Sequence, residues 1–255
     1  MTPNLNHRQR ELLSLVQREG FASVDALAAQ FSVTHQTIRR DINQLATLKL
    51  LRRYHGGAAA PSSVENVAYH ARQVLYLEEK QGIAQLVAEH IPDQASLFIN
   101  LGTTTEEVAK ALNRHRGLRV ITNNLNVASV MCAYPECEVI ITGGVVRARD
   151  RGITGEATID FIREFKVDFG IIGISSIEAD GTLRDFDHHE VRVAEAIMAQ
   201  SRKVFLVADH SKFGRPALIR LGHLSQVDAL FTDQPAPEAM AQIFAEAGTV
   251  VHVAR

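Results

Sequence analysis

Forked polar side chains gather on one face of a helix that we predict to begin after Thr34. At about 100° per residue, Gln36, Arg40 and Asn43 point in one direction, with Arg39 on the flank. The amides of Gln and Asn and the guanidinium of Arg match the hydrogen-bonding edges of adenine and guanine in the major groove of DNA. This face could therefore read a base sequence.

The opposite face of the helix carries the residues that would hold it on a hydrophobic core. Ile38, Ile42 and Leu45 have the i, i+4, i+7 spacing of a buried stripe. Thr34 suits the N-cap position. The first turn, which a recognition helix presents to the bases, then contains His35, Gln36 and Thr37.

A second helix and a tight turn precede this one. Ser23 can cap a short helix over residues 24–30, and residues 31–33 leave only a turn between the two. A further helix over residues 6–19 ends at Gly20 and would pack against the recognition helix. This spacing is that of a helix-turn-helix.

Basic residues follow the recognition helix in a stretch that predicts a β-hairpin. Arg52, Arg53 and His55 come just before Gly56 and Gly57, an arrangement that indicates two strands of a wing beside the DNA phosphates. An Arg pair on an amphipathic helix is by itself more often a solvated surface. The adjoining basic hairpin favours DNA binding instead.

From residue 77 onward, helical and strand patterns alternate. The predicted elements are helix 77–91, strand 96–100, helix 105–113, strand 119–122, helix 126–133, strand 138–142, helix 157–165, strand 168–174, helix 190–201, strand 204–209, strand 229–232, helix 237–246 and strand 249–253. Such alternation predicts an α/β domain with a largely parallel sheet and helices on both faces. Ligands of such sheets bind beyond the carboxyl ends of the strands.

The loop after strand 96–100 could bind an anion. It contains Gly102, Thr103, Thr104 and Thr105 directly before a helix, and so offers backbone N–H groups and hydroxyls. A capping box of Thr103 with Glu106, or of Thr104 with Glu107, explains the same residues without a ligand. The sequence leaves both explanations open.

Later strand ends add further effector-binding candidates. They are Asn123 and Asn124, Gly143 and Gly144, Arg147, and Lys212. Asn amides can hold hydroxyl groups, paired glycines allow close backbone approach, and Arg can bind a phosphate through two hydrogen bonds. Asn and Gly are also ordinary turn residues, and an Asp–Lys pair such as Asp209 with Lys212 is commonly a surface ion pair.

Two further functional possibilities lie in the second half of the sequence. Residues 185–190, DFDHHE, gather carboxylates and imidazoles, but Asp187 with Glu190 is also a helix cap and the two His are adjacent, so we predict a ligand-gating loop, no metal and no cofactor. A sugar-phosphate isomerase is a second functional class, with Asp209, Lys212 and Glu190 as acid and base groups.

Charge is distributed unevenly along the 255 residues. The net charge is −2, but residues 1–58 hold eight Lys and Arg against four Asp and Glu, and the remainder holds nineteen against twenty-five. A basic head on an acidic body suits a protein whose head alone contacts nucleic acid. Cys132 and Cys137 are too few for a disulfide framework. Without a signal-peptide pattern or about 18 consecutive apolar residues, a cytoplasmic protein is expected.

The segments TIRRDINQL and RRYHGGA, at this separation, resemble the DNA-binding domain of the DeoR family of bacterial repressors. The remainder is similar to that family's effector domain through LGTTT, TNNLNVA, ITGG, GITGEATIDF, DFGIIGIS and DHSKFGR. The resemblance implies a fold like that of ribose-phosphate isomerases, a phosphate bound near residues 102–105 and a ligand contact by Lys212. Asn100 departs from the family, which commonly has Asp there.

We therefore expect a winged helix-turn-helix over residues 1–58, a linker over residues 59–74 and an effector-binding and oligomerisation domain over residues 75–255. Within the family, FDHHEVR, DHSKFGR and TNNLNVA are most similar to repressors of glycerol metabolism genes. That similarity implies operator DNA as a partner and sn-glycerol 3-phosphate as inducer; another phosphorylated sugar or polyol is the alternative. A homodimer or homotetramer would pair two heads on a near-palindromic operator.

Overall fold

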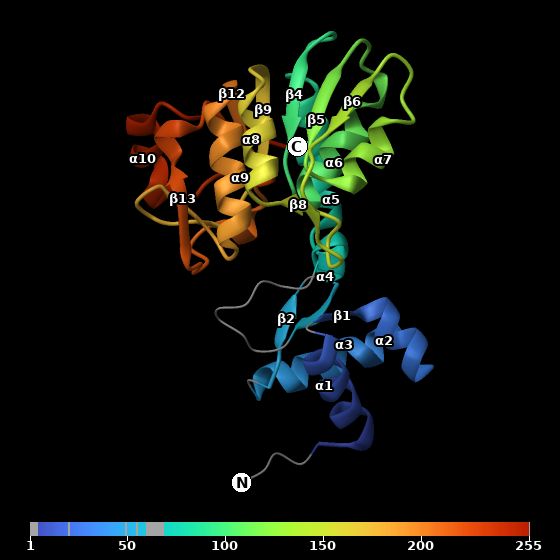
Figure 1. Ribbon diagram of the computed structural model, residues 1–255. Coiled ribbons are helices and arrows are strands. Elements are labelled where there is room, and N and C mark those ends of the chain that lie inside the picture. The colour runs from blue at the N-terminus through green and yellow to red at the C-terminus, as the bar shows by residue number, and fades with distance from the viewer. Residues whose placement is uncertain (1–4, 20, 49, 55, 60–68, 255) are drawn as a thin grey trace. The chain divides into compact units, whose positions relative to one another are not determined.

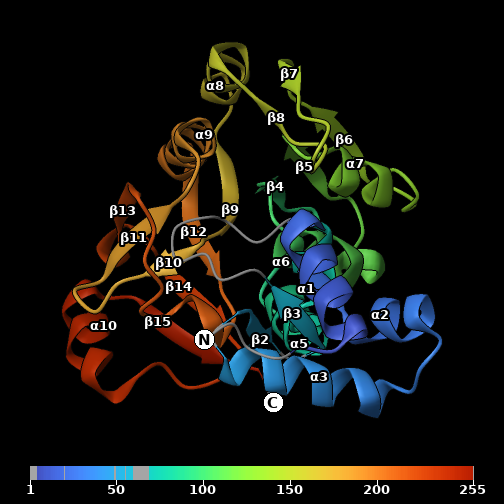
Figure 2. The same ribbon diagram turned by 90° about the horizontal axis from the view of Figure 1, so that it is seen from below.

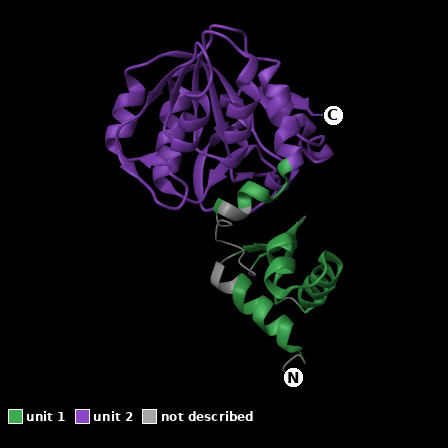
Figure 3. Cartoon of the chain, turned by 90° about the vertical axis from the view of Figure 1, so that its right-hand side faces the viewer, with its two compact units in different colours: residues 1–77 green, residues 78–255 purple. Residues whose placement is uncertain are grey.

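The computed structural model describes residues 5–19, 21–48, 50–54, 56–59 and 69–254. The chain divides into two compact units, residues 1–77 and residues 78–255, which are green and purple in Figure 3. We call them the head unit and the body unit. Each has a hydrophobic core of its own.

The head unit contains the predicted helix-turn-helix and a small antiparallel sheet (Figure 1). Its helices are α1 (His7–Glu19), α2 (Val24–Phe31), α3 (His35–Thr47) and α4 (Tyr69–Val74). Its strands, in spatial order, are β1 (Phe21–Ser23), β3 (Gly57–Ala59) and β2 (Arg52–Tyr54). Strands β2 and β3 form the predicted wing, and β1, which we did not predict, pairs with β3. Of the expected linker, Ala59 belongs to β3 and residues 69–74 are α4, while residues 60–68 lie outside the described residues.

Both predicted helix caps in the head unit are confirmed. The Ser23 hydroxyl accepts a hydrogen bond from the backbone N–H of Ala26 at 3.0 Å, and the Thr34 hydroxyl accepts one from that of Thr37 at 3.2 Å. Ser32 ends α2 in the left-handed conformation with φ of 51°. The turn is therefore tight enough to bring α3 against α2.

The core of the head unit forms where the sequence stripe predicts it. Ile38, Ile42 and Leu45 of α3 are buried and pack with residues of α1 and α2. In the wing, Gly57 lies so close to the Phe21 ring that a Cβ atom there would be 2.4 Å from the ring edge. Only glycine fits at this position.

A buried carboxylate joins the first helix to the recognition helix. Asp41 lies on the core side of α3 and is 4% exposed. Arg8 of α1 donates to its carboxylate at 2.7 Å, and the Gln9 amide donates to it at 3.1 Å. The hydrogen bond to Asp41 outweighs the effect of burial and raises the pKa of Arg8. These hydrogen bonds to a charged group fix the position of α3 relative to α1.

The body unit is built on one seven-stranded parallel sheet. Its strands, in spatial order, are β15 (Val250–Val253), β14 (Ala229–Thr232), β12 (Ser201–Val207), β9 (Val167–Gly173), β4 (Ser96–Ile99), β5 (Arg119–Thr122) and β6 (Glu138–Ile141). All seven strands predicted from the sequence are strands of this sheet, although β12 begins three residues earlier than predicted. The order of connection reverses between β4 and β9, so a crevice is expected there.

Helices cover both faces of the sheet, as predicted; α6 and α9 lie on opposite sides of β9 in Figure 2. The first face packs against α5 (Leu77–Ala88), α6 (Thr103–Ala111) and α7 (Leu125–Met131). The second packs against α8 (Glu156–Arg163), α9 (His188–Ala199) and α10 (Ala241–Ala247). Leu97 and Ile99 of β4 face the first layer and Phe98 faces the second, which is the alternation of a strand buried on both sides.

Short strands that we did not predict complete the body unit. They are the hairpin β7 (Val145–Val146) with β8 (Ile153–Thr154), and the small antiparallel sheet β10 (Ser176–Ile177), β11 (Thr182–Asp185) and β13 (Ile219–His223). Single-turn 3₁₀ helices are η1 (Leu112–Arg114), η2 (His210–Lys212), η3 (Leu224–Gln226) and η4 (Glu238–Met240). Across the described ranges of the chain, no helix has the length and apolar character needed to cross a membrane.

The hydrogen bonds of Arg8 and Gln9 to Asp41 lead to a prediction about stability. Asp41→Asn should lower the free energy of opening of α1 and α3 by about 1–3 kcal/mol, because it weakens charged hydrogen bonds at a buried site. Hydrogen exchange of the amides of these two helices measures it. Glu11→Gln is the control, since the exposed pair of Glu11 with His7 should contribute less than about 0.5 kcal/mol. Equal effects of the two substitutions would contradict the role given to Asp41.

Candidate nucleic-acid interface and effector site

The polar face of α3 is free of the core of the head unit. Gln36, Arg39, Arg40 and Asn43 are all exposed, on the side opposite the buried stripe. Among the residues that the structure describes, none forms an ion pair with either arginine. Two forked amides and two unpaired guanidinium groups on one helix face are suited to base edges and phosphates.

The first turn of α3 is partly used by the head unit itself. The His35 ring lies 3.3 Å from the Asp25 carboxylate, with both side chains exposed. The Thr37 hydroxyl is 2.9 Å from the Thr34 hydroxyl and belongs to the cap. Of the three predicted DNA contacts in this turn, His35 and Thr37 thus have partners within the head unit, and Gln36 is exposed.

The wing presents its basic residues to solvent. Arg52 and Arg53 are both exposed on β2, an edge strand that pairs only with β3 among the described strands. Arg53 pairs in register with Ala58, and Arg52 with Ala59. His55, the third basic residue predicted here, lies outside the described residues.

In the body unit, α6 begins without a side-chain cap. Gly102 is the N-cap residue, with φ of 148°, and no side-chain cap accepts a hydrogen bond from the backbone N–H groups of the first turn. The Thr105 hydroxyl donates instead to the carbonyl oxygens of Asn100 and Gly102, at 2.7 and 2.8 Å. Neither expected capping box forms, because the helix starts at Thr103 and places all three threonines inside it. The backbone N–H groups of this turn are thus directed at the carboxyl edge of the sheet.

The two glutamates of α6 are turned to other partners. Glu106 accepts hydrogen bonds from the amides of Asn124 and Asn126, at 3.0 and 3.1 Å. Glu107 pairs with Lys110 at 2.6 Å. The oxygen of the Asn124 amide caps α7 by accepting from the backbone N–H groups of Asn126 and Val127. Both ends of the Asn124 amide therefore bond within the protein.

Arg147 is the centre of an ion network. Its guanidinium lies 2.6 Å from Asp150, 2.9 Å from Asp187 and 2.7 Å from Glu190. Burial opposes the charged form, but the surrounding carboxylates outweigh it and raise the pKa of Arg147. The side chain is 16% exposed. Arg147 thus fastens the β7–β8 hairpin to the start of α9.

The paired glycines form the bend before that hairpin. The Gly143 carbonyl accepts a hydrogen bond from the Thr158 hydroxyl at 2.7 Å. Gly144 has φ of 138°, and a Cβ atom on it would lie 2.4 Å from the same hydroxyl. Gly144 therefore allows the chain to pass close to α8, which is a packing role, whereas a Cβ atom on Gly143 would meet nothing within 4 Å.

Lys212 lies beside a buried carboxylate at the end of β12. Its Nζ is 3.6 Å from Asp209, which is fully buried and also accepts from the backbone N–H and hydroxyl of Ser211. Burial raises the pKa of Asp209, but Lys212, Ser211 and Lys80 outweigh it, so the pKa is lowered. Lys212 and Lys80 thus both place positive charge near the carboxyl end of β12.

Lys80 was missed in the sequence analysis. It is 3% exposed on α5, four residues before Ala84 and three before Ile83, both in the core. The sequence did contain a signal for it, because a charged residue at the spacing of the core-facing positions of a helix is expected to be buried. Asp41 in α3 has the same signal.

The segment of residues 185–190 is a helix start held by arginines. Asp187 caps α9 by accepting from the backbone N–H groups of His189 and Glu190, as predicted. Arg149 also binds Asp187, at 2.7 Å. Within the described parts of the chain, no three His, Cys, Asp or Glu side chains are grouped as metal ligands.

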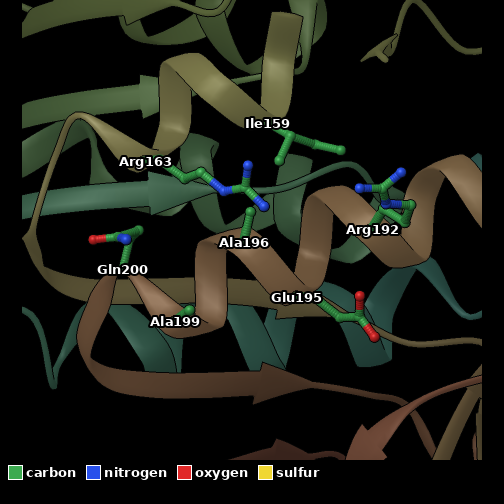
Figure 4. A pocket seen from close by; sticks show the side chains of 7 residues that line it. All are labelled: Ile159, Arg163, Arg192, Glu195, Ala196, Ala199 and Gln200. Carbon is green, nitrogen blue, oxygen red and sulfur yellow. The ribbon is translucent and has the colours of Figure 1, made fainter. Parts of the chain in front are cut away.

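A separate pocket lies between α8 and α9 (Figure 4). Arg163 extends over Ala196 of the neighbouring helix in this view. Arg163 pairs with Asp160 at 3.1 Å, and Arg192 pairs with Glu156 at 2.6 Å. The pocket includes the ends of both helices, which lead into the amino ends of β9 and β12, so it is not part of the carboxyl edge.

Both units match known families. Residues 8–64 match the DeoR-like helix-turn-helix domain, and residues 76–234 match the DeoR C terminal sensor domain. The glycerol-3-phosphate regulon repressor of Escherichia coli is 50% identical over 239 residues, which are 94% of this chain and 95% of that protein. The repressor of the same name from Haemophilus influenzae is 50% identical over 242 residues, 95% of this chain and 94% of that protein. Ribose 5-phosphate isomerase A of Neisseria gonorrhoeae is a distant structural neighbour, with a TM-score of 0.39 and 15% identity over 52% of each chain.

The ion network predicts acid sensitivity. Burial raises the pKa of Asp187, but Arg147 and the backbone N–H groups of α9 outweigh it and lower the pKa. A carboxylate with a lowered folded pKa contributes stability that is complete above the unfolded value of about 3.9 and is lost as the pH falls below it. Asp187→Asn keeps a residue that can cap the helix but removes the charge. It should lower the free energy of unfolding at pH 7 by about 1 kcal/mol and make that free energy depend less on pH below about 4.

Urea unfolding of the body unit at several pH values measures this. Asp160→Asn is the matched control, because the Asp160 pair with Arg163 is exposed and should change stability by less than about 0.5 kcal/mol. An unchanged acid dependence in Asp187→Asn would rule out this contribution.

Proposed function

The chain belongs to the DeoR family of DNA-binding transcriptional repressors, and from that premise we propose that it controls genes of glycerol and glycerol-3-phosphate metabolism. The observation that carries the proposal is the similarity, along almost the whole chain, to two repressors of the glycerol-3-phosphate regulon. We propose sn-glycerol 3-phosphate as the molecule that releases it from operator DNA. Because its partner is DNA, we place its action in the cytoplasm.

In the head unit, we assign base contacts to the exposed face of α3. Gln36, Arg40 and Asn43 would read bases, with Arg39 beside them. Arg52 and Arg53 of the wing would bind phosphates, together with His55. A homo-oligomer would place two such heads on the half-sites of one operator.

In the body unit, we assign the phosphate of the inducer to the start of α6 and to Lys212. The uncapped first turn, from Gly102 to Thr105, offers backbone N–H groups at the positive end of the helix dipole. Lys80 and Lys212 supply positive charge at the same edge of the sheet. Asn124 and Arg147 have partners within the protein and are left out of this assignment.

Release from DNA requires the inducer to favour one arrangement of the protein over another. If the inducer binds the DNA-free arrangement more tightly, DNA weakens inducer binding by the same factor. The isomerase alternative is set aside, because the relatives are repressors and Glu190, one of its proposed catalytic groups, is used in ion pairs with Arg147 and Arg149. Another phosphorylated sugar or polyol stays an alternative inducer.

Two arginines should affect DNA binding differently. Arg40→Ala should cost about 1–3 kcal/mol on operator DNA and relax the choice of base, because a base-edge contact is lost. Arg52→Ala should weaken binding to all sequences and reduce the salt slope by about one. Fluorescence anisotropy with operator and random duplexes separates them, and Arg163→Ala in the body unit is the control. Equal losses of Arg40→Ala on both duplexes would contradict its assignment.

The inducer assignment is tested by release from operator DNA. sn-Glycerol 3-phosphate should release the wild-type protein, whereas glycerol and fructose phosphates should not. Lys212→Met should bind operator normally and require about 10–100 times more inducer, since a hydrogen bond to a charged group is lost. Lys166→Met is the control, because this exposed ammonium group donates to the Ala199 carbonyl at 2.9 Å near the amino end of β9, and it should behave as wild type. Release by another phosphate would keep the repressor and replace its inducer.

A further inference from the structure

Three neighbouring strands of the body sheet end in a row of polar residues. Ile99 of β4, Thr122 of β5 and Ile141 of β6 are paired in register. The next residues are Asn100, Asn123 and Thr142, which we call the acceptor row. Adjacent members lie one strand spacing apart, about 4.8 Å.

The side chains of the acceptor row point to one face of the sheet. Phe98, Ile121 and Ile140 stand two positions before them and pack in the core beneath α8 and α9. Residues two apart on a strand point to the same side. The row therefore faces the α8–α9 side and not the α6 side.

Each member of the row has a buried polar atom without a hydrogen-bond partner among the described residues. These atoms are Oδ1 of Asn100, Oδ1 of Asn123 and Oγ1 of Thr142. The three residues are 5%, 1% and 3% exposed. Native proteins keep few such atoms, and three in one row require a reason.

Polar groups next to the acceptor row do have hydrogen-bond partners. Thr122, one position earlier, donates its hydroxyl to the Ile99 carbonyl at 2.6 Å. The nitrogen of the Asn123 amide donates to the Ile153 carbonyl at 3.1 Å, which fixes the amide and leaves its oxygen as the unpaired end. Among the described residues, one further buried atom at this edge lacks a hydrogen-bond partner, Oδ2 of Asp209 after β12, and it lies 3.6 Å from the Lys212 ammonium group. The unpaired atoms after β4, β5 and β6 are those of the acceptor row.

The start of strand β8 lies against Asn123, the middle member of the row. Asn123 bonds Ile153 through both its backbone and its side chain, and Asn124 forms a bridge with Gly152. Gly152 is pressed on Leu101, since a Cβ atom there would lie 2.6 Å from the Leu101 side chain. A molecule that reached Asn123 would therefore lie next to the β7–β8 hairpin.

The chemistry of the row specifies what it binds. Amide oxygens accept hydrogen bonds, and the threonine hydroxyl accepts or donates them. The row has no ionisable group, so it suits a neutral portion of a ligand that carries hydroxyl donors. Asn100 stands only two residues before Gly102, where the first turn of α6 begins. We propose that the acceptor row recognises the hydroxyl groups of a phosphorylated polyol whose phosphate lies at α6; this rests on the proposed function of the body unit.

Thr142→Val tests the row with little change in side-chain shape. It should leave the melting temperature unchanged or raised, because it removes a buried unpaired hydroxyl, and should weaken sn-glycerol 3-phosphate binding about 5–20-fold. Thr142→Ser should bind as wild type. The matched control is Thr249→Val, whose buried hydroxyl donates to Leu224 at 2.8 Å at the other edge of the sheet. It should lower the melting temperature by about 2–4 °C and leave affinity unchanged.

Calorimetric titration of the full-length variants with four ligands identifies the hydroxyl involved. The ligands are sn-glycerol 3-phosphate, 3-hydroxypropyl phosphate, propane-1,2-diol 1-phosphate and ethyl phosphate. The loss caused by Thr142→Val should disappear for the analogue that lacks the contacted hydroxyl.

The outcomes separate this inference from the proposed function. If wild type binds sn-glycerol 3-phosphate and Thr142→Val binds it equally well, the row is not the hydroxyl subsite and the proposed inducer stands. If wild type prefers another phosphorylated polyol and Thr142→Val weakens that ligand, the row is upheld and the glycerol assignment fails. If Thr142→Val loses stability without losing affinity, its hydroxyl serves the fold and the inference is overturned.

Discussion

The parallel direction of all seven body strands is the constraint on which the effector domain depends. Because every strand runs the same way, every carboxyl end opens on one edge, and loops far apart in sequence meet there. Gly102, Asn123, Thr142 and Lys212 follow four different strands, yet all belong to this edge. The strand order reverses between β4 and β9. From this point β4, β5 and β6 follow one another toward one side of the sheet, and β9, β12, β14 and β15 toward the other.

Internal partners then decide which polar groups at this edge are available. Arg147 is chemically the best phosphate ligand among the candidates, but three carboxylates surround its guanidinium. Its ion pairs instead link the β7–β8 hairpin to α9. Asn124 is used for a helix cap and for Glu106. The uncapped turn of α6 and the acceptor row have hydrogen-bonding capacity that the described residues do not use.

In the head unit, too, some polar groups are used by the fold and others are left to bind a partner. One side of α3 is committed to the fold through Ile38, Ile42, Leu45 and the buried carboxylate of Asp41. The other side has forked polar groups in solvent. The hydrogen bonds of Arg8 and Gln9 to Asp41 lie on the side of α3 that faces away from solvent. They fix the orientation of the helix more narrowly than apolar contacts alone, because hydrogen bonds are directional.

The sequence by itself determined the family, the helix-turn-helix with its caps, the wing, and all seven strands of the body sheet, because each depends on spacing within one short segment. It also located most strand-end candidates. It did not determine that the threonines of LGTTT lie inside α6 instead of capping it, that Arg147 is surrounded by Asp150, Asp187 and Glu190, or that Lys80 approaches Asp209. The small antiparallel sheet escaped prediction for a related reason, since β11 pairs with β13 from a distant part of the chain. Only the tertiary structure decided these points, because hydrogen bonds and ion pairs between distant segments depend on which strands become neighbours.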